Sequence, residues 1–186
     1  IFYTNGLLGS RKSQTYSNFN DFMYNLSYWS SWSNGFNIWK SEFDKIDKNL
    51  KLNKLFPHTS LFLTQHQAKL FCINDNLLFD VQRIPKRGGH NKFEAFTIEY
   101  PSLLDECCKK GHISTKCKKH ILFGIMVQFL PSLLFNKYII RIETFDDTGF
   151  RNNLKKYYPS YAYWLVLISV LGVPFRLFCR KLKNKR

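Results

Sequence analysis

Cysteine and histidine side chains cluster between residues 105 and 120, where the sequence reads DECCKKGHISTKCKKH. Cys108, His112, Cys117 and His120 have the spacing C-x3-H-x4-C-x2-H, with Cys107 beside the first of them. Thiolate and imidazole groups are the usual ligands of structural zinc, and four of them close a tetrahedral site. This compact spacing matches no standard zinc finger, and lysines surround it. We therefore expect a solvated loop with reduced thiols, and no bound metal or other cofactor.

A second candidate for chemistry is the loop Pro85–Asn91, which reads PKRGGHN. Its glycines permit the backbone to approach a phosphate closely, and Lys86 and Arg87 supply positive charge. The loop lacks the spacing of a P-loop or a dinucleotide-binding motif. It is therefore either an anion contact or a solvated turn, and we count Lys86 and Arg87 among the candidate RNA-binding residues.

The rest of the sequence offers no pattern typical of an active site. It contains no evident Ser/His/Asp arrangement, carboxylate pair or Walker-like motif, and His58, His66 and His90 are scattered. We expect these histidines to be structural or solvated, and we predict that the protein is not an enzyme.

Charge is the strongest feature of the composition. The 186 residues carry a formal net charge of +15, and the sequence pI is about 9.7. So basic a chain repels itself unless a polyanion lies nearby, which indicates nucleic acid or an anionic membrane surface as a partner. Five unevenly spaced cysteines argue against a secreted disulfide framework.

Residue usage indicates an AT-rich genome, because 18 Phe and 10 Tyr stand against alanines at positions 68, 95 and 162 only. Organelle genomes often start on codons that are read as isoleucine elsewhere, and the first residue is Ile1. Together these observations predict a mitochondrion-encoded chain that lies in the matrix. A processed product of an AT-rich nuclear genome is the alternative.

We expect an α+β fold with three regions. Residues 1–57 form an aromatic-rich region, which is either an extension that lies on a large surface or an ordinary small core. Within it, Phe43, Ile46 and Leu50 have the spacing of an amphipathic helix, and Pro57 ends that helix.

Residues 58–136 read as a β-rich region with an antiparallel or mixed sheet. Strands are predicted at Leu61–Thr64, Lys69–Ile73, Leu77–Val81 and Lys92–Tyr100, and Asn74–Asn76 is a hairpin signal. The apolar run 121–135 is shorter than a typical membrane span of about 20 residues. A buried helix or strand is expected there.

Residues 137–186 are predicted to form a β-α-β unit with a basic hairpin tip. Tyr138–Phe145 is rich in β-branched and aromatic residues, a helix is expected from Ser160 to Leu171, and Gly172 and Pro174 end it. After Asp147 there is no acidic residue and there are nine cations. The candidate RNA-binding residues of this tip are Arg176, Arg180, Lys181, Lys183, Lys185 and Arg186.

The same stretch can also be interpreted as a membrane anchor from Tyr157 to Cys179. Tyrosines and Trp164 would form an interfacial belt, and the basic end would stay on the inner side. Pro159, Pro174 and Arg176 interrupt the run, so the straight apolar helix between them is too short to span comfortably.

The segments Ile139–Asp146, Ser160–Leu167 and Leu171–Val173, followed by the basic end, resemble the first half of the universal small-subunit ribosomal protein number ten, its mitochondrial members above all. The resemblance covers about the last fifty residues. It implies a β-α-β unit leading into a basic hairpin that penetrates ribosomal RNA. The sequence thus predicts a structural constituent of a mitochondrial ribosome, with ribosomal RNA and neighbouring ribosomal proteins as partners. The alternative is a non-catalytic single-span membrane subunit of a mitochondrial respiratory or ATP synthase complex.

Overall fold

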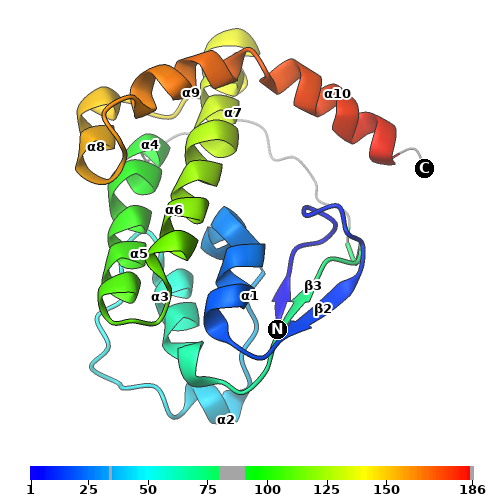
Figure 1. Ribbon diagram of the computed structural model, residues 1–186, viewed down its shortest axis with the longest axis vertical. Coiled ribbons are helices and arrows are strands. Elements are labelled where there is room, and N and C mark those ends of the chain that lie inside the picture. Colours follow the sequence, from blue (N-terminus) through cyan, green and yellow to red (C-terminus); the bar gives the residue numbers. More distant parts are fainter. Residues whose placement is uncertain (34, 80–90, 185–186) are drawn as a thin grey trace. The chain divides into compact units, whose positions relative to one another are not determined.

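The computed structural model describes residues 1–33, 35–79 and 91–184, the last five of these by their backbone alone. The chain divides into two compact units (Figure 1): unit 1 is Ile1–Gln82 with Ser102–Ile121, and unit 2 is Arg83–Pro101 with Leu122–Arg186. These boundaries differ from the three predicted regions, because two continuous helices run from one unit into the other. The fold is mixed helix and sheet, as the sequence predicted at this level.

Unit 1 contains a small mixed sheet of β1 (Phe2–Tyr3), β2 (Ser13–Tyr16) and β3 (Phe71–Asn74). β3 lies in the centre, parallel to β1 and antiparallel to β2, so the order is β1-β3-β2. Phe2 is opposite Ile73, and Thr15 is opposite Cys72. The predicted strand at Lys69–Ile73 is therefore present with shifted ends, but it pairs with the N-terminal segments and not across a hairpin at Asn74–Asn76.

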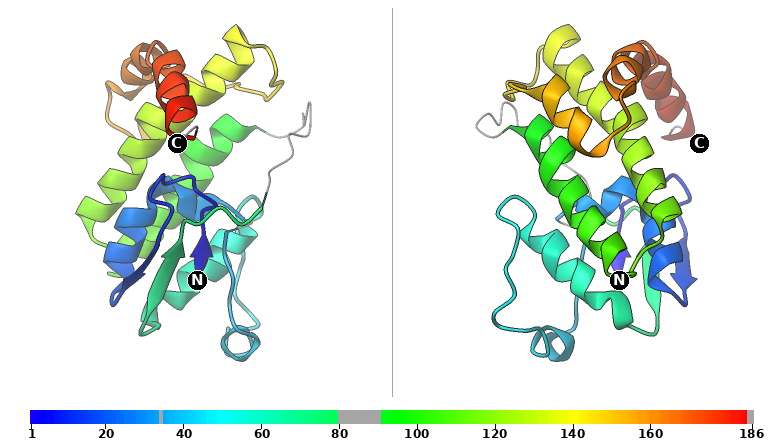
Figure 2. Two further views of the ribbon diagram at one scale, coloured as in Figure 1. Left: turned by 90° about the vertical axis from the view of Figure 1, so that its right-hand side faces the viewer. Right: turned by 60° about the vertical axis from the view of Figure 1, so that its left-hand side comes forward.

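Before β3, unit 1 also contains helices and helical turns, of which the first packs on that strand (Figure 2). They are α1 (Phe19–Leu26), η1 (Ser27–Ser31), α2 (Lys40–Phe43), α3 (Pro57–Leu63) and η2 (Thr64–Gln67). The ring of Phe22 stacks on Phe71 with centroids 5.1 Å apart, and Phe62 contacts both Phe19 and Phe22. Phe2, Phe19, Phe22 and Tyr28 thus belong to a core, whereas Trp39 is 77% exposed.

One carboxylate holds the N-terminal loop of unit 1 in place. Asp75 is fully buried directly after β3, and its side chain accepts hydrogen bonds from Thr4 Oγ1 and from the backbone N–H groups of Leu8, Ser10 and Arg11. The Ser10 hydroxyl donates a further bond of 3.0 Å. Because these donors surround the ionised form, residues 4–11 fold around a single negative charge.

Several predicted strands are helical, and these predictions were wrong. Leu61–Thr64 lies in α3 and η2, and Pro57 begins α3 at a position where its missing N–H costs nothing. Lys92–Tyr100 forms α4 (Lys92–Glu94), the π-helical turn η3 (Ala95–Glu99) and the start of α5 (Tyr100–Lys109). The Asn91 side chain caps α4 by accepting from Glu94 N–H at 2.7 Å. Short apolar runs do not by themselves distinguish strand from buried helix.

The other predictions for unit 1 were also partly wrong. Leu77 to Phe79 form no strand, and the rest of the run Leu77–Val81 lies outside the described residues. The amphipathic helix predicted from Phe43 is limited to α2, and residues 44–56 form turns. The Asp47 carboxylate accepts from the backbone N–H of Asn49, an Asx turn that competes with helix formation.

A continuous helix of 25 residues, Thr115–Ile139, contains the apolar run 121–135, so of the two expected alternatives, helix or strand, the helix is present. It consists of α6 (Thr115–Gly124), the π-helical turn η4 (Ile125–Phe129), α7 (Leu130–Leu134) and the π-helical turn η5 (Phe135–Ile139). Pro131 lies inside it and has no N–H to donate to the carbonyl of Val127, four residues back. The widened turn η4 accommodates the proline, as η3 does before Pro101.

Residues 137–184 form helices and no strand, so the predicted β-α-β unit is wrong for the described part of the chain. The helices are α8 (Phe150–Tyr157), α9 (Ala162–Val170) and α10 (Val173–Asn184). The β-rich run instead finishes η5 and continues as a loop, because Lys137 Nζ holds the loop by bonds to Phe145 O and Asp147 Oδ1. Helix α9 ends as expected. Pro174, which was predicted to prevent a helix from continuing, instead lies in the first turn of α10.

We predict that Asp75→Asn lowers the free energy of unfolding by about 2 to 3 kcal/mol, because the amide would face backbone N–H donors. Burial alone would raise the pKa of Asp75, but the hydrogen bonds from Thr4, Arg11, Leu8 and Ser10 outweigh it and hold that pKa below 3.8. Its contribution is therefore complete above pH 3.8 and is lost as the pH falls through the folded-state pKa.

Urea unfolding at several pH values tests this prediction. The wild type should lose its advantage over Asp75→Asn only in acid. Asp44→Asn is the matched control, since Asp44 is an exposed partner of Lys40 and should change stability little. Equal stability of wild type and Asp75→Asn at pH 7 would contradict the assigned role.

Candidate polyanion-binding surface

The candidate RNA-binding residues are placed unevenly by the structure. Lys86, Arg87, Lys185 and Arg186 lie outside the described residues. Arg180, Lys181 and Lys183 belong to α10, but the structure describes their backbone only. Arg176 is the one candidate whose side chain is described, and its geometry is informative.

Arg176 directs its guanidinium at backbone carbonyls of its own unit. Nη1 donates to Val127 O, and Nη2 donates to Ser169 O at 3.4 Å. Val127 O is the acceptor that the N–H at position 131 would serve if that residue were not proline. Arg176 therefore joins α10 to the π-helical turn η4, and this use competes with a role on phosphates.

Helix α8 presents cations that the candidate residues did not include. Gly149 precedes α8 with a φ of 75°, a left-handed conformation that glycine adopts without strain. Phe150 and Leu154 are buried, which turns Arg151, Lys155 and Lys156 outward. None of the ion pairs among the described residues involves these three cations. They form a positive patch with no neutralising carboxylate.

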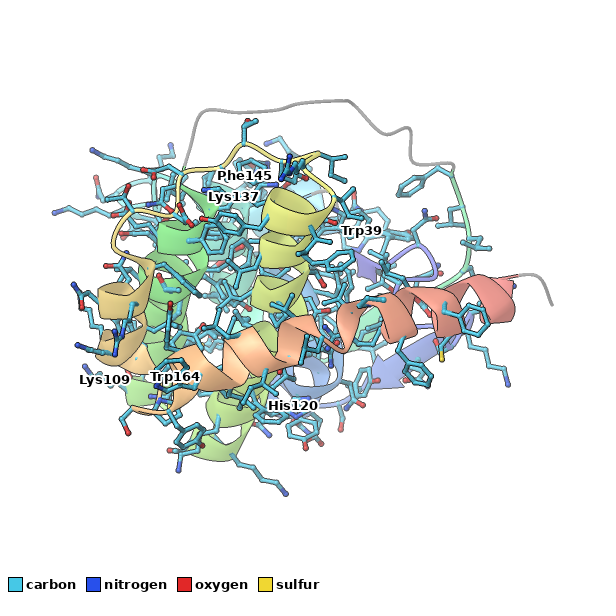
Figure 3. All side chains as sticks on the ribbon, turned by 90° about the horizontal axis from the view of Figure 1, so that it is seen from above. Trp39, Lys109, His120, Lys137, Phe145 and Trp164 are labelled. Carbon is cyan, nitrogen blue, oxygen red and sulfur yellow. The ribbon has the colours of Figure 1, made fainter. Side chains whose placement is uncertain are left out.

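Helix α9 and the start of α10 bury one face and expose the other. Ala162, Val166 and Val173 are at most 2% exposed, and α9 packs on η4 and α7. On the opposite side lies a row of large apolar residues that we call the apolar stripe, each 58–82% exposed: Tyr161, Trp164, Ile168, Leu171, Phe175 and Phe178. Figure 3 looks onto this side of unit 2 and labels Trp164.

The apolar stripe is a functional candidate that the sequence prediction missed. Its members recur at intervals of three and four residues, the spacing of one helix face. The sequence does not distinguish this face, because the residues of α9 between the stripe positions are apolar too. The positive patch adjoins the stripe, since the Arg151 guanidinium lies 5.2 Å from the Tyr163 ring and 5.9 Å from the Trp164 ring.

The cysteine and histidine cluster of unit 1 does not converge on one point. His112 stacks on His66 with ring centroids 3.5 Å apart, and His120 stacks on Tyr24 at 4.0 Å. Cys117 is buried and its thiol donates to Asn20 O. Within the described residues, no group of three or more histidine, cysteine or acidic side chains could hold a metal ion.

A hollow of about 210 Å³ lies beside this cluster, lined by residues that include His66, Cys107 and His112. Burial raises the pKa of Cys107 to about 12, and the nearby Cys108 adds to the effect. Burial also lowers the pKa of His112, with a further contribution from His66. The Cys107 thiol is thus protonated at neutral pH, so it is not an activated nucleophile.

Comparison with known proteins gives no relative: no protein-family model, curated protein or solved structure matches the chain.

Among the described residues, one helix is long and apolar enough to cross a membrane, namely Thr115–Ile139, and 56% of its most apolar part is buried within the protein. The pair Ala162–Val170 and Val173–Cys179 passes the same test when counted as one span, but it bends by 53°. The core helix of a soluble protein has the same length and composition, so these features alone do not decide between lipid and protein surroundings.

We predict that the purified protein contains no stoichiometric zinc, because His112 and His120 are each stacked on another ring. Elemental analysis of the protein, expressed in zinc-supplemented medium, measures this directly. Cys108→Ser and Cys72→Ser should have the same metal content as the wild type. One zinc per chain that is lost in Cys108→Ser and kept in Cys72→Ser would show that the cluster binds metal after all.

We predict that iodoacetamide alkylates Cys108 much faster than Cys107 at pH 8. Both lie on the same helix, but Cys107 is 4% exposed with a pKa of about 12, while Cys108 is partly accessible. Thiolate is the reacting form, so the reaction at Cys107 should be slower by about a hundredfold or more. Peptide mass spectrometry follows both sites in one digest, and unfolding in urea should equalise them. Equal rates in the folded protein would refute the buried placement.

Proposed function

We propose that this chain is a non-catalytic structural constituent of the small subunit of a mitochondrial ribosome, and that its cations bind ribosomal RNA. Charge is the observation that carries the proposal: the net charge is +15, and the 39 residues after Asp147 carry nine cations and no carboxylate. The exposed patch of Arg151, Lys155 and Lys156 belongs to this stretch. Neighbouring ribosomal proteins would be its other partners.

The binding mechanism follows from the chemistry of phosphates. Lysine and arginine side chains displace condensed counterions from the RNA backbone, and the released ions drive association. Such contacts position a protein on RNA without reading bases. Rigid helices hold Arg151, Lys155 and Lys156 at fixed spacing, which lets several charges act on neighbouring phosphates together. The proposal rests on this charge and on the resemblance of the C-terminal sequence. It does not rest on the fold of this stretch, because residues 137–184 form no β-α-β unit in the described structure.

A second candidate is a non-catalytic membrane subunit of a mitochondrial respiratory or ATP synthase complex. The observation that favours it is the helix Thr115–Ile139, whose length and apolar composition suit a span. The anchor first expected at Tyr157–Cys179 is less suited to a straight span, because α9 and α10 meet at 53°. Carbonate extraction separates the two candidates, since it should release a ribosomal protein and leave a spanning subunit in the membrane.

We predict that changing Arg180, Lys181, Lys183 and Lys185 to Ser weakens incorporation into ribosomal particles and flattens its salt dependence. Each phosphate contact contributes a slope of about 0.9 to the logarithmic salt dependence for a duplex. Cosedimentation with ribosomal particles over a range of salt concentrations measures both effects.

The matched control for this variant changes Lys40, Lys45, Lys48 and Lys51 to Ser. It removes the same number of lysine or arginine charges from unit 1, where Lys40 and Lys45 pair with carboxylates. Its incorporation should stay near that of the wild type. If both variants cosediment like the wild type, the C-terminal cations do not bind the RNA. If only the tail variant detaches from membranes while it still assembles, the C-terminal cations act on lipid and not on RNA, and the ribosomal proposal is wrong.

A further inference from the structure

The apolar stripe is too large and too exposed to be left in water. Its six side chains include a tryptophan, a tyrosine and two phenylalanines, and Leu171 is 82% exposed. Continuous apolar rows of this kind mark contact sites for protein or lipid. Either a protein or a lipid surface therefore covers the apolar stripe.

Several observations on unit 2 favour lipid. The stripe bends by 53° where α9 meets α10, so it offers no straight seam to a partner helix. Arg151 lies beside it, over the rings of Tyr163 and Trp164, and Lys155 and Lys156 belong to the same helix as Arg151. The sequence adds five cations after residue 179 without any carboxylate after Asp147. An aromatic and aliphatic face bordered by cations is the pattern of helices that lie on anionic bilayers, and Trp and Tyr prefer the level of the headgroups.

The packing of the two helices decides between lying on a bilayer and crossing it. Helix α9 has nine residues and α10 has twelve, lengths of about 14 and 18 Å, against about 30 Å for the hydrocarbon core. The face opposite the stripe is already occupied, because Ala162 and Val166 are buried in unit 2. Arg176 further holds the start of α10 by its bonds to Val127 O and Ser169 O. In α9 only one side is open to lipid, whereas α10 is exposed on more of its surface after Val173, where Leu177 is 47% exposed.

We propose that α9 and α10 form a membrane-surface element, in which the apolar stripe enters the interface of an anionic bilayer while the cations of α8 contact lipid phosphates. The stripe side chains would lie among the headgroups and the first acyl carbons, and Ala162, Val166 and Val173 would stay packed in unit 2. This binding requires no ribosomal RNA, so it holds whether or not the proposed function is correct.

The test measures cosedimentation of the whole protein with vesicles of equimolar phosphatidylcholine and phosphatidylglycerol. The stripe variant carries Trp164→Ser, Ile168→Ser and Phe175→Ser, all at exposed positions. The matched control carries Trp39→Ser, Leu70→Ser and Phe79→Ser, which removes similar side chains that are 47–77% exposed in unit 1. The stripe variant should bind the vesicles at least about tenfold more weakly than the wild type, and the control should bind like the wild type. Far-UV circular dichroism confirms that both variants remain folded.

Fluorescence quenching by brominated phosphatidylcholine in the same vesicles locates the contact. Trp164→Phe should keep vesicle binding and lose most of the quenching, while Trp39→Phe should keep both. Vesicles of phosphatidylcholine alone should bind the wild type more weakly by about tenfold or more, because the cations contribute only when the lipid is anionic. Carbonate should release the bound protein, as expected for an element that lies on the surface.

The opposite results are distinct. Equal vesicle binding by wild type and stripe variant would overturn the proposal, as would equal binding to neutral and anionic vesicles. Resistance to carbonate would show a span and not a surface element. If the stripe variant loses cosedimentation with ribosomal particles while vesicle binding is absent from all proteins, the stripe contacts the ribosome and the lipid proposal is wrong. Failure of the tail variant alone to join ribosomal particles would affect only the ribosomal proposal.

Discussion

Pro131 imposes the constraint on which the arrangement of unit 2 depends. A proline within a helix offers no N–H to the carbonyl four residues earlier, and its ring crowds that carbonyl. The helix accommodates it by widening into the π-helical turn η4, and Val127 O receives a guanidinium N–H from Arg176. A charged donor such as this guanidinium forms a stronger hydrogen bond with the carbonyl than a neutral donor would. Through this bond a defect in one helix fixes the place where the last helix begins.

That placement gives α9 and α10 two different faces. Val166 packs on the same stretch of helix that Pro131 distorts, and Arg176 bonds beside it, so the inner face is specified by both packing and hydrogen bonding. The outer face is then fixed by geometry, since residues three and four apart share one side of a helix. The exposed row from Tyr161 to Phe178 is thus a direct result of how the inner face is held. Arg176 serves structure here, which leaves the positive charge for partners to α8 and to the cations that follow.

The sequence predicted the features that depend on local chemistry. Helix α9 follows from a long apolar run, and a strand near residue 71 follows from β-branched and aromatic residues. For the apolar run 121–135 the sequence left helix and strand open, and the structure has a helix. The strand predictions at Leu61–Thr64 and Lys92–Tyr100 were wrong because a short apolar run fits both the strand period and the helix period. The hydrogen bonds that favour the helix, such as the cap by Asn91, are made by residues outside the run. The strand predicted at Tyr138–Phe145 is absent, because a strand needs a partner and the bonds of Lys137 to Phe145 O and Asp147 Oδ1 hold the segment as a loop.

The candidate site illustrates the same limit at a finer level. Composition alone predicts an anionic partner, because nine cations without a carboxylate are visible after Asp147 in the sequence. It does not establish which cations are available, since Arg176 differs from Arg151 only by what each meets in the fold: two carbonyls in one case, and the open faces of Tyr163 and Trp164 in the other. An arginine that stacks on an aromatic face still has N–H donors available for a phosphate. An arginine that donates to backbone carbonyls already uses part of its donors. Charge therefore predicts the class of partner, and the hydrogen bonds of each cation determine which of them could reach such a partner.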